Sequence, residues 1–566
     1  MYKHWLIEIA IFLTILTILA IPMGEYMAKV FTGQRNILSP IMLPIENYLY
    51  KIFKIDAHED MDWKGFALNF FWFNLAGIIF LFLLQLAQRY LPFNPENFGA
   101  IRWDTALNAA ISYVTNTDWQ PYPVESTLSY LTQMLGFSLQ NFFAIASGMA
   151  ISIAFINAFV RKNTRGLGNF WVYLTKSLLY VLLPLALILS IILLSQGCPD
   201  NLNPYTRVNT LEGKQQIIAQ GPVASQVGVK ALGGGGGYFT ANAAHPYENP
   251  TPFTDYLTIF SFLILAAAFP FTFGAMTSNR ANGWAIFIAM LLLFILFLGV
   301  ALWSESQGNP LLAKLGLIHG ANMEGKEMRL GVLSSTMFCT SSAAASAGTV
   351  NAALDSLMPI TGLICMLHLA LGGVGFGCAG LGLVMMLFYA MLAMFLIGLM
   401  IGRTPEIYGK KLGSYETIMI NLMLFLPGAL QLIFGAISAA TNMGTTTLTD
   451  YSPHGITQIA YTTISTIVNN GSAFNGFKTD TLFYNLTSGL GMLVGRAVVI
   501  ICTLATASSI AAKKISPQAS CFATTNLLFI FVLLAVILVF GVSIFLPVVV
   551  LGPVMEHLAI FAGKTF

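Results

Sequence analysis

Charge is the scarcest property of this 566-residue chain. Only 9% of its residues are Asp, Glu, Lys or Arg, whereas 56% are hydrophobic and the mean hydropathy is +0.74. Soluble domains carry about 25% charged residues, so the composition predicts an integral membrane protein. The net charge of +3 is too small and too dispersed to indicate a nucleic-acid partner.

The chain also lacks the motifs of metal and nucleotide chemistry. Its six cysteines show no CxxC or Cys/His ligand spacing, which argues against a disulfide framework and a metal centre. No P-loop and no Asp-Lys-Thr-Gly-Thr phosphorylation motif is present, so we expect no ATP to be bound by this chain. A membrane-embedded enzyme would need clustered acids or histidines, and none occurs. These absences predict a non-catalytic protein.

Long apolar segments are what the sequence has in abundance. A spanning helix needs about 20 apolar residues, and ten segments approach this length: 5–22, 66–88, 129–159, 170–196, 254–275, 283–303, 357–401, 415–438, 482–510 and 521–550. No small-x-small cleavage site follows the first, so we expect it to be retained as a helix.

Four polar stretches between these segments share one form, a helical piece of about ten residues followed by a small or polar loop. The loop centres Asn116, Gly237, Gly348 and Gly471 recur at intervals of 121, 111 and 123 positions. This internal repeat predicts an all-α integral membrane fold of ten transmembrane helices, with four pseudo-symmetric helix–pore loop–helix repeats and one extra helix at each end. The predicted division is an N-terminal helix and cytoplasmic loop (1–64), repeats at 65–165, 166–280, 281–411 and 412–514, and a C-terminal helix (515–566).

Lysine and arginine set the predicted orientation. The loops opposite the pore loops hold fourteen cations, mostly in short connections: Lys29, Arg35, Lys51, Lys54, Lys64, Arg161, Lys162, Arg165, Arg280, Arg403, Lys410, Lys411, Lys513 and Lys514. By the positive-inside rule these loops are cytoplasmic. The pore loops and both chain ends are therefore expected outside.

Segment 357–401 is too long for one straight crossing. Two crossings would place the fourth polar loop opposite the other three, so parity favours one broken crossing. The glycine-rich stretch 371–382 is where it would break. Non-helical backbone at membrane depth needs burial or a water-filled cavity. A gate and close helix packing through small residues both explain the glycines.

The second polar loop holds five consecutive glycines, Gly233–Gly237. Glycine tolerates positive φ, so such a loop can aim several carbonyl oxygens at one point, although a flexible spacer is the alternative. Rings of carbonyls replace the hydration shell of K⁺, and the C-terminal ends of four short helices add partial negative charge. Only Asp118 and Glu248 are acids close by, whereas Ca²⁺ and Mg²⁺ recruit carboxylates. The loops therefore predict a potassium site.

Several stretches resemble the family of potassium-binding A subunits of bacterial Kdp potassium pumps. They occur in order along the whole chain: Val114–Gln120, Gly235–Asn242, His245–Pro250, Gly348–Ala352, Gly402–Lys411 and Asn469–Phe474. The resemblance implies a four-subunit complex in a bacterial inner membrane. In it this chain would select K⁺ from outside, the B subunit (a P-type ATPase) would hydrolyse ATP, and a C subunit and a small F subunit would stabilise the assembly in the membrane lipid.

The resemblance also implies residue roles. The filter would comprise Thr115, Asn116, Thr117, Gly233, Gly234, Gly235, Ala347, Gly348, Asn469, Asn470 and Gly471. Gln120 and Asp118 would lie at its mouth, and Gly375, Gly377 and Arg403 would serve gating or coupling. The ion would leave sideways toward the B subunit, with the broken third-repeat helix as a barrier. The chain departs from the family where Gly233 and Gly234 replace Thr-Asn, and where Ala347 replaces a small polar residue or Cys.

Four residues allow two interpretations each, and Arg496 allows one. His245 is an anchor of its loop or part of a gate, and Asp118 attracts cations or caps a turn. A charge within an apolar helix marks a functional site, or in the case of Lys176 only extends to the membrane surface. Arg496 would balance charge near the cavity. Arg403 couples to the ATPase or anchors its loop. The alternative function is a free-standing potassium channel-like transporter of the same superfamily.

Overall fold

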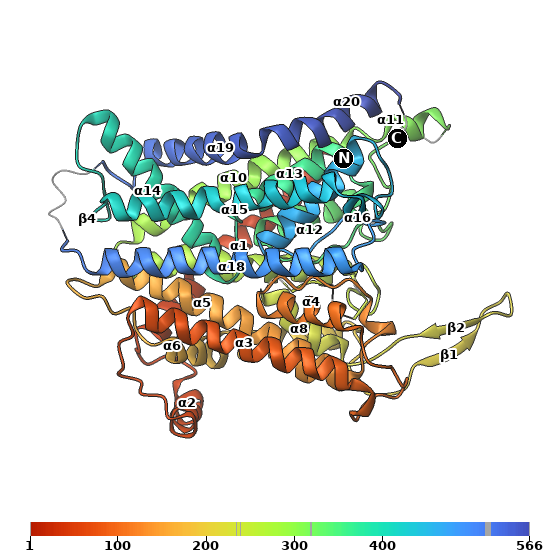
Figure 1. Cartoon of the computed structure of the whole chain (residues 1–566), viewed down its shortest axis with the longest axis horizontal. Coiled ribbons are helices and arrows are strands. Elements are labelled where there is room, and N and C mark those ends of the chain that lie inside the picture. Colours follow the sequence, from red (N-terminus) through yellow and green to blue (C-terminus); the bar gives the residue numbers. More distant parts are fainter. Residues whose placement is uncertain are drawn as a thin grey trace.

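A computed structural model describes residues 2–233, 235–237, 239–240, 242–316, 320–515 and 522–564. Its long helices run side by side along the long axis of the molecule (Figure 1). Within the described residues, ten helices are long and apolar enough to cross a membrane. This number confirms the count predicted from the sequence.

Each of the four repeats contains a long helix, a short helix that stops inside the bundle, a loop and a second long helix. The first has α3 (Trp63–Ala87), α4 (Trp103–Val114) and α5 (Leu139–Val160). The second has α6 (Phe170–Lys176) joined to α7 (Leu183–Ser195) by a π-helical turn, then α8 (Val223–Gly233) and α9 (Pro252–Met276). The third has α10 (Arg280–Ser306), α12 (Gly331–Ala345), α13 (Pro359–Ala370) and α14 (Leu381–Ile401), and the fourth has α15 (Ser414–Ala440), α17 (Pro453–Ile467) and α18 (Leu482–Ala511).

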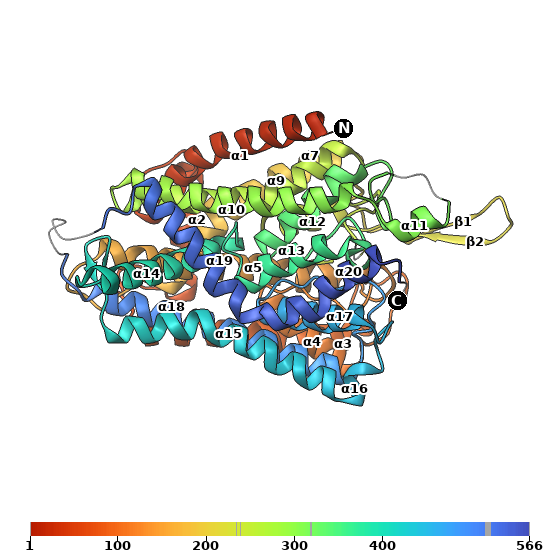
Figure 2. The same ribbon diagram turned by 90° about the horizontal axis from the view of Figure 1, so that it is seen from above.

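The two extra helices lie at the chain ends. Helix α1 (Tyr2–Phe31) is longer than the apolar segment 5–22 and packs against α9 (Figure 2). The C-terminal span contains α19 (Leu527–Val549) and continues through a π-helical turn into α20 (Met555–Phe561). Both termini lie at the end of the bundle that holds the short helices (Figures 1 and 2). The side of the membrane they face stays a prediction.

Local sequence explains where several helices begin. The Ser452 hydroxyl accepts a hydrogen bond from the backbone N–H of His454, and Pro453 occupies the first turn of α17. A Ser N-cap followed by Pro in the first turn is a favoured helix start. Asp62 caps α3 in the same way by accepting from the N–H of Gly65.

The second long helix of the third repeat is broken into two pieces, α13 and α14. Helix α13 ends at Ala370, α14 begins at Leu381, and Gly372, Gly373 and Gly380 between them have positive φ. That conformation strains residues with a Cβ atom. The break predicted at 371–382 is therefore confirmed, and its physical cause is glycine.

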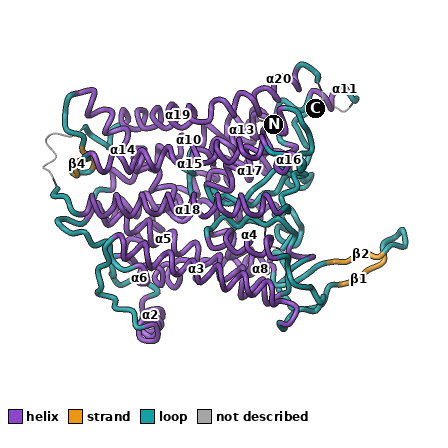
Figure 3. The backbone as a smooth tube through the Cα atoms, viewed as in Figure 1, coloured by secondary structure: helices purple, strands orange, loops and turns teal. Residues whose placement is uncertain are grey.

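Other elements were not expected from the apolar pattern. Helix α2 (Ser39–Phe53) occupies part of what was expected to be a cytoplasmic loop. Strands β1 (Thr206–Asn209) and β2 (Gln215–Ile218) form an antiparallel hairpin that projects beyond the helices (Figure 3). The remaining short elements are α11 (Pro310–Lys314), α16 (Asn442–Thr445), β3 (Glu406–Ile407) and β4 (Lys410–Lys411).

Candidate ion-binding site

Four short helices end inside the bundle, and each leads into one polar loop. Helices α4, α8, α12 and α17 end at Val114, Gly233, Ala345 and Ile467. The last carbonyls of a helix lack intrahelical partners and carry partial negative charge. The loops therefore begin where the backbone already favours a cation.

Three of the loops share one backbone pattern. In each, two residues with left-handed φ are separated by one residue: Asn116 and Asp118, Ser346 and Gly348, Asn469 and Gly471. Asn, Asp and Gly tolerate this conformation best. The pattern aligns Asp118 with Gly348 and Gly471, so the loop centre taken at Asn116 from the sequence lies two residues too early.

The loops touch one another edge to edge. A Cβ atom on Gly348 would lie 2.1 Å from the carbonyl oxygen of Asn470, and one on Gly236 would lie 2.0 Å from that of Asp118. A Cβ atom on Gly471 would lie 2.0 Å from the carbonyl oxygen of Thr117. The third loop therefore contacts the fourth, the fourth contacts the first, and the first contacts the second.

Side chains from the first and fourth loops add hydrogen bonds between loops. Asn469 Nδ2 donates to Thr117 Oγ1 at 2.8 Å, and Asn116 Nδ2 donates to the carbonyl oxygen of Gly233 at 3.1 Å. The hydroxyls of Thr115 and Thr117 lie 2.8 Å apart. Of the residues predicted to form the filter, Gly234 lies outside the described residues.

The third loop meets the fourth through a residue that the sequence did not single out. Ser346 Oγ, next to the predicted filter residue Ala347, donates weakly to the carbonyl oxygen of Asn469 at 3.4 Å. Ala347 is buried, and its N–H donates to the carbonyl oxygen of Ser342 at 2.7 Å. Asn470 accepts from the N–H of Ser472 at 2.9 Å. Ser346 occupies the same position in its loop as Asn116 and Asn469 do in theirs. This equivalence is seen only when the loops are aligned by backbone conformation.

A buried ion pair supports the glycine-rich second loop. The side chains of Lys230 and Glu248 are each 1% exposed and form a salt bridge. Glu248 also accepts from the backbone N–H and the hydroxyl of Thr240 at 3.0 and 2.7 Å. The N–H of Gly235 donates to the carbonyl oxygen of Lys230 at 2.8 Å. The loop is thus held by residues outside the glycine run. In the sequence, the one sign of this ion pair was Lys230, a cation in a short apolar helix.

Hydrogen bonds occupy the side chains predicted at the mouth. Asp118 is fully buried; its Oδ2 accepts from Asn141 Nδ2 at 2.7 Å, whereas its Oδ1 has no hydrogen-bond partner among the described residues. Gln120 accepts from the hydroxyl of Tyr113 at 2.9 Å and donates to the carbonyl oxygen of Tyr122 at 2.7 Å. These contacts fix the first loop and favour a structural contribution from both residues.

His245 lies in the chain that follows the second loop. Its Nδ1 accepts from the backbone N–H of Tyr247 at 3.1 Å, and its ring contacts the Tyr247 ring edge-on. Its backbone carbonyl oxygen accepts from the N–H groups of Glu248 and Asn249. These local contacts favour the anchor over the gate.

A cavity of about 70 Å³ separates the loops from the break in the third repeat. Asn116 and Asn469 line it from the loops, Gly377 lines it from the break, and Arg496 lines it from α18. Arg496 is 5% exposed, and its Nε and Nη2 atoms have no hydrogen-bond partner among the described residues. A fixed positive charge therefore lies beside the loops, in a space that can hold water.

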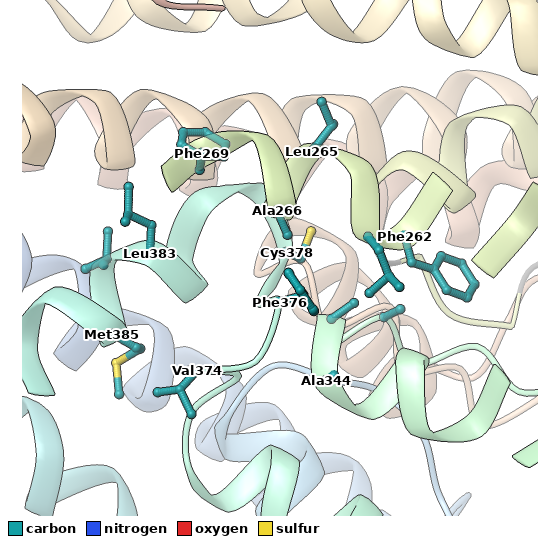
Figure 4. Close-up of a cluster of buried hydrophobic side chains, with 14 of the residues drawn as sticks. Phe262, Leu265, Ala266, Phe269, Ala344, Val374, Phe376, Cys378, Leu383 and Met385 are labelled. Atoms are coloured by element: carbon teal, nitrogen blue, oxygen red, sulfur yellow. The ribbon is translucent and has the colours of Figure 1, made fainter. Parts of the chain in front are cut away.

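The break packs tightly against its neighbours. Figure 4 shows Val374, Phe376 and Cys378 on the extended chain between α13 and α14, close to α12 and α9. The N–H of Phe376 donates to the carbonyl oxygen of Ala344 at 3.3 Å, and Cys378 Sγ donates to that of Gly233. The break thus touches two of the pore-loop helices directly.

The predicted gating and coupling residues occupy different places. A Cβ atom on Gly377 would lie 2.6 Å from the carbonyl oxygen of Gly373, so this glycine permits a compact turn. At Gly375 a Cβ atom would make ordinary contacts of 3.4 Å with Ala344 and His368. Arg403 follows α14, lines a separate pocket with Phe522 and is not brought to the loops.

Solved structures share this fold. The crystal structure of the potassium transporter TrkH from Vibrio parahaemolyticus aligns with a TM-score of 0.50 and 16% identity. The alignment covers 78% of this chain and 85% of TrkH. At this identity the likeness concerns the fold alone, and it agrees with the fold class predicted from the sequence.

Sequence relatives span the full length. A protein from a strain of Methylorubrum extorquens, named potassium-transporting ATPase potassium-binding subunit, is 46% identical over 561 residues, covering 99% of this chain and 98% of its own. One of the same name from Brucella anthropi is 45% identical, covering 99% of both chains. The family model for the potassium-transporting ATPase A subunit matches residues 10–558. The chain therefore belongs to the family of potassium-transporting ATPase A subunits, which confirms the resemblance seen in the sequence.

Proposed function

We propose that this chain is the potassium-binding and translocating subunit of an ATP-driven potassium pump. The names of its full-length relatives support the ion and the ATPase complex. The observation that carries the proposal is the edge-to-edge contact of the loops, in which Gly236, Gly348 and Gly471 each lie against a carbonyl of the neighbouring loop. Backbone oxygens from four loops can thus surround one axis.

The chemistry is replacement of water by carbonyl oxygens. Leaving water without replacement costs an ion tens of kcal/mol, and K⁺ accepts backbone carbonyls as ligands. The oxygens would come from 115–117, 233–235, 347–348 and 469–471, with the helix ends adding partial negative charge. Gly375 and Gly377 would form part of the barrier beyond the cavity, and Arg403 would take part in coupling.

The partner chains follow from the family. A P-type ATPase B subunit would hydrolyse ATP, and this chain would contribute no catalytic residue to that reaction. A C subunit and a small F subunit would complete the complex in the lipid of a bacterial inner membrane. The loops and both termini would face the periplasm, because the short cation-rich connections lie at the other side.

Purification of the full chain from native membranes tests this function. We expect a P-type ATPase chain to co-purify, and we expect ATP hydrolysis by the complex to rise when K⁺ replaces Na⁺. The chain separated from its partners should hydrolyse no ATP. If it instead purifies alone and conducts K⁺ in liposomes without ATP, the free-standing channel-like transporter replaces this proposal.

A further inference from the structure

Helix α2 lies at the edge of the bundle, across the direction of the spanning helices. In Figure 1 it is seen almost end-on, below α6, and it is the lowest element in the view. It exposes large apolar side chains: Ile41 is 63% exposed, Tyr48 64% and Phe53 68%. Apolar exposure on a helix lying across the spans is typical of the membrane interface. We therefore place α2 at the lipid headgroup level.

A cavity of about 400 Å³ lies between α2, the end of α1 and the second-repeat helix α6 with its π-helical turn. Arg35 reaches it from the turn between α1 and α2, and Lys176 reaches it from the last residue of α6. Neither side chain forms a hydrogen bond or a salt bridge with any described residue. A Cβ atom on Gly33 would lie 4.0 Å from Lys176 Nζ, which puts the ammonium beside the end of α1.

The cavity carries an excess of positive charge. Glu46 is the one carboxylate among the described residues that line it. Its two oxygens accept hydrogen bonds from the hydroxyls of Tyr50 at 2.8 Å and Tyr180 at 2.6 Å. Ser39, at the N-terminal end of α2, also lines the cavity, where the helix dipole is positive. Two cations thus face one carboxylate, each of whose oxygens already accepts one hydrogen bond.

The position of Lys176 adds to this argument. It belongs to the span Phe170–Ser195, where a charge is costly unless something neutralises it. Leu43, 49% exposed, lines the same cavity, so apolar surface adjoins the two cations. A ligand that matches both features has an anionic head and an apolar body.

We propose that this cavity binds the phosphate headgroup of an anionic phospholipid, with Arg35 and Lys176 contacting the phosphate. The acyl chains would lie along the exposed apolar side chains of α2. Basic pockets at helix boundaries bind anionic headgroups in this way. The site takes a lipid and not free phosphate because apolar side chains adjoin the cations and α2 lies at the membrane surface.

Native mass spectrometry of the full chain tests the proposal, with phosphatidylglycerol and phosphatidylcholine supplied in equal amounts. We expect the chain to retain phosphatidylglycerol in preference. Each surface cation contributes roughly fivefold to anionic lipid binding, so the double variant Arg35→Gln/Lys176→Gln should lose about 25-fold in affinity. A matched double variant of two exposed lysines elsewhere, Lys411→Gln/Lys514→Gln, should keep the preference.

Further variants make the result decisive. Arg35 lies on an exposed turn, so Arg35→Gln alone should lower the affinity for phosphatidylglycerol about fivefold without affecting folding. Lys176→Arg keeps the positive charge and should keep the wild-type affinity. Equal retention of both lipids, equal loss in the control double variant, or displacement of the lipid by excess inorganic phosphate would each overturn the proposal. Potassium-stimulated ATP hydrolysis is measured separately. It tests the proposed pump function, whatever the outcome for the lipid site.

Discussion

Gly471 of the fourth loop lies against Thr117 of the first so closely that a Cβ atom on the glycine would be 2.0 Å from the threonine carbonyl oxygen. Gly471 also has a φ of +96°. A side chain at this position is therefore excluded both by its neighbour and by its own backbone. The contact joins loops that are more than 350 residues apart in the chain.

Gly471→Ala should weaken potassium binding. The substitution must move the fourth loop away from Thr117, and placing Ala at positive φ costs about 1 kcal/mol or more. We expect the K⁺ concentration for half-maximal ATP hydrolysis by the complex to rise about tenfold, because 1.4 kcal/mol is a factor of ten. Gly99→Ala is the matched control, since a Cβ atom there has open space within 4 Å. An unchanged K⁺ dependence of Gly471→Ala would remove this loop from the filter.

Lys230→Met should destabilise the protein strongly. It would leave the carboxylate of Glu248 buried without its cation, and breaking a buried pair from one side costs about 3–5 kcal/mol. The double variant Lys230→Met/Glu248→Leu should recover much of that loss, because both charges are gone. Thermal unfolding in detergent, run on both single variants and the double variant, measures the coupling. Additive losses would show that the two side chains do not act as a pair.

His454 predicts a pH dependence. Burial alone would lower the pKa of His454, but hydrogen bonds to Asp355 at 2.9 Å and Glu556 at 2.8 Å raise it to about 10. The unfolded pKa is about 6.5, so the stabilisation is complete below pH 6.5 and is lost as pH rises toward 10. It amounts to a few kcal/mol at most.

The measurement for His454 is the difference in melting temperature between the wild type and His454→Gln. We expect this difference to be largest at pH 6.5 and to shrink steadily up to pH 10. Comparing the two proteins at each pH cancels the titration of other groups. A difference that stays constant would show that the histidine is neutral in the folded protein.

Arg496→Gln should increase passive ion passage. The guanidinium lies beside Asn116 and Asn469 in the cavity, where a fixed positive charge repels K⁺ and limits its accumulation. Neutralising the charge should raise rubidium uptake into vesicles without ATP several-fold, whereas Arg496→Lys should restore the low rate. Lys411→Gln, an exposed cation outside the cavity, serves as the control. If rubidium uptake by Arg496→Gln without ATP stays as low as that of the wild type, the charge has a structural role and does not limit ion passage.

Helix number, the broken crossing and the loop positions could be predicted from the sequence. The length of an apolar segment indicates a spanning helix, and clustered glycines indicate where a helix breaks or a loop forms. The Ser452-Pro453 start of α17 is of the same kind. Helix α2 was missed because it lies across the direction of the spanning helices and is too short to be a span (Figure 1). Its apolar residues do recur with a helical period, but its 15 residues fall short of the length of about 20 expected of a span.

The contacts between loops could not be predicted, because they join residues far apart in the chain. Lys230 and Glu248 are only 18 positions apart, at the two ends of the second loop. The sequence does not show that the loop brings their side chains together in a salt bridge. The equivalence of Ser346 with Asn116 and Asn469 rests on φ, which residue type alone leaves open. The alignment by residue type was consequently two positions out in the first loop.

The β1–β2 hairpin extends past the helices at the end where both termini lie (Figure 3). Its turn holds Leu211, which is fully exposed, and the turn closes through a hydrogen bond from the N–H of Thr210 to the carbonyl oxygen of Lys214. A short peptide epitope inserted there would leave the bundle untouched. Antibody labelling of sealed vesicles would then report which way each molecule has inserted, and would sort right-side-out from inverted preparations before any flux is recorded.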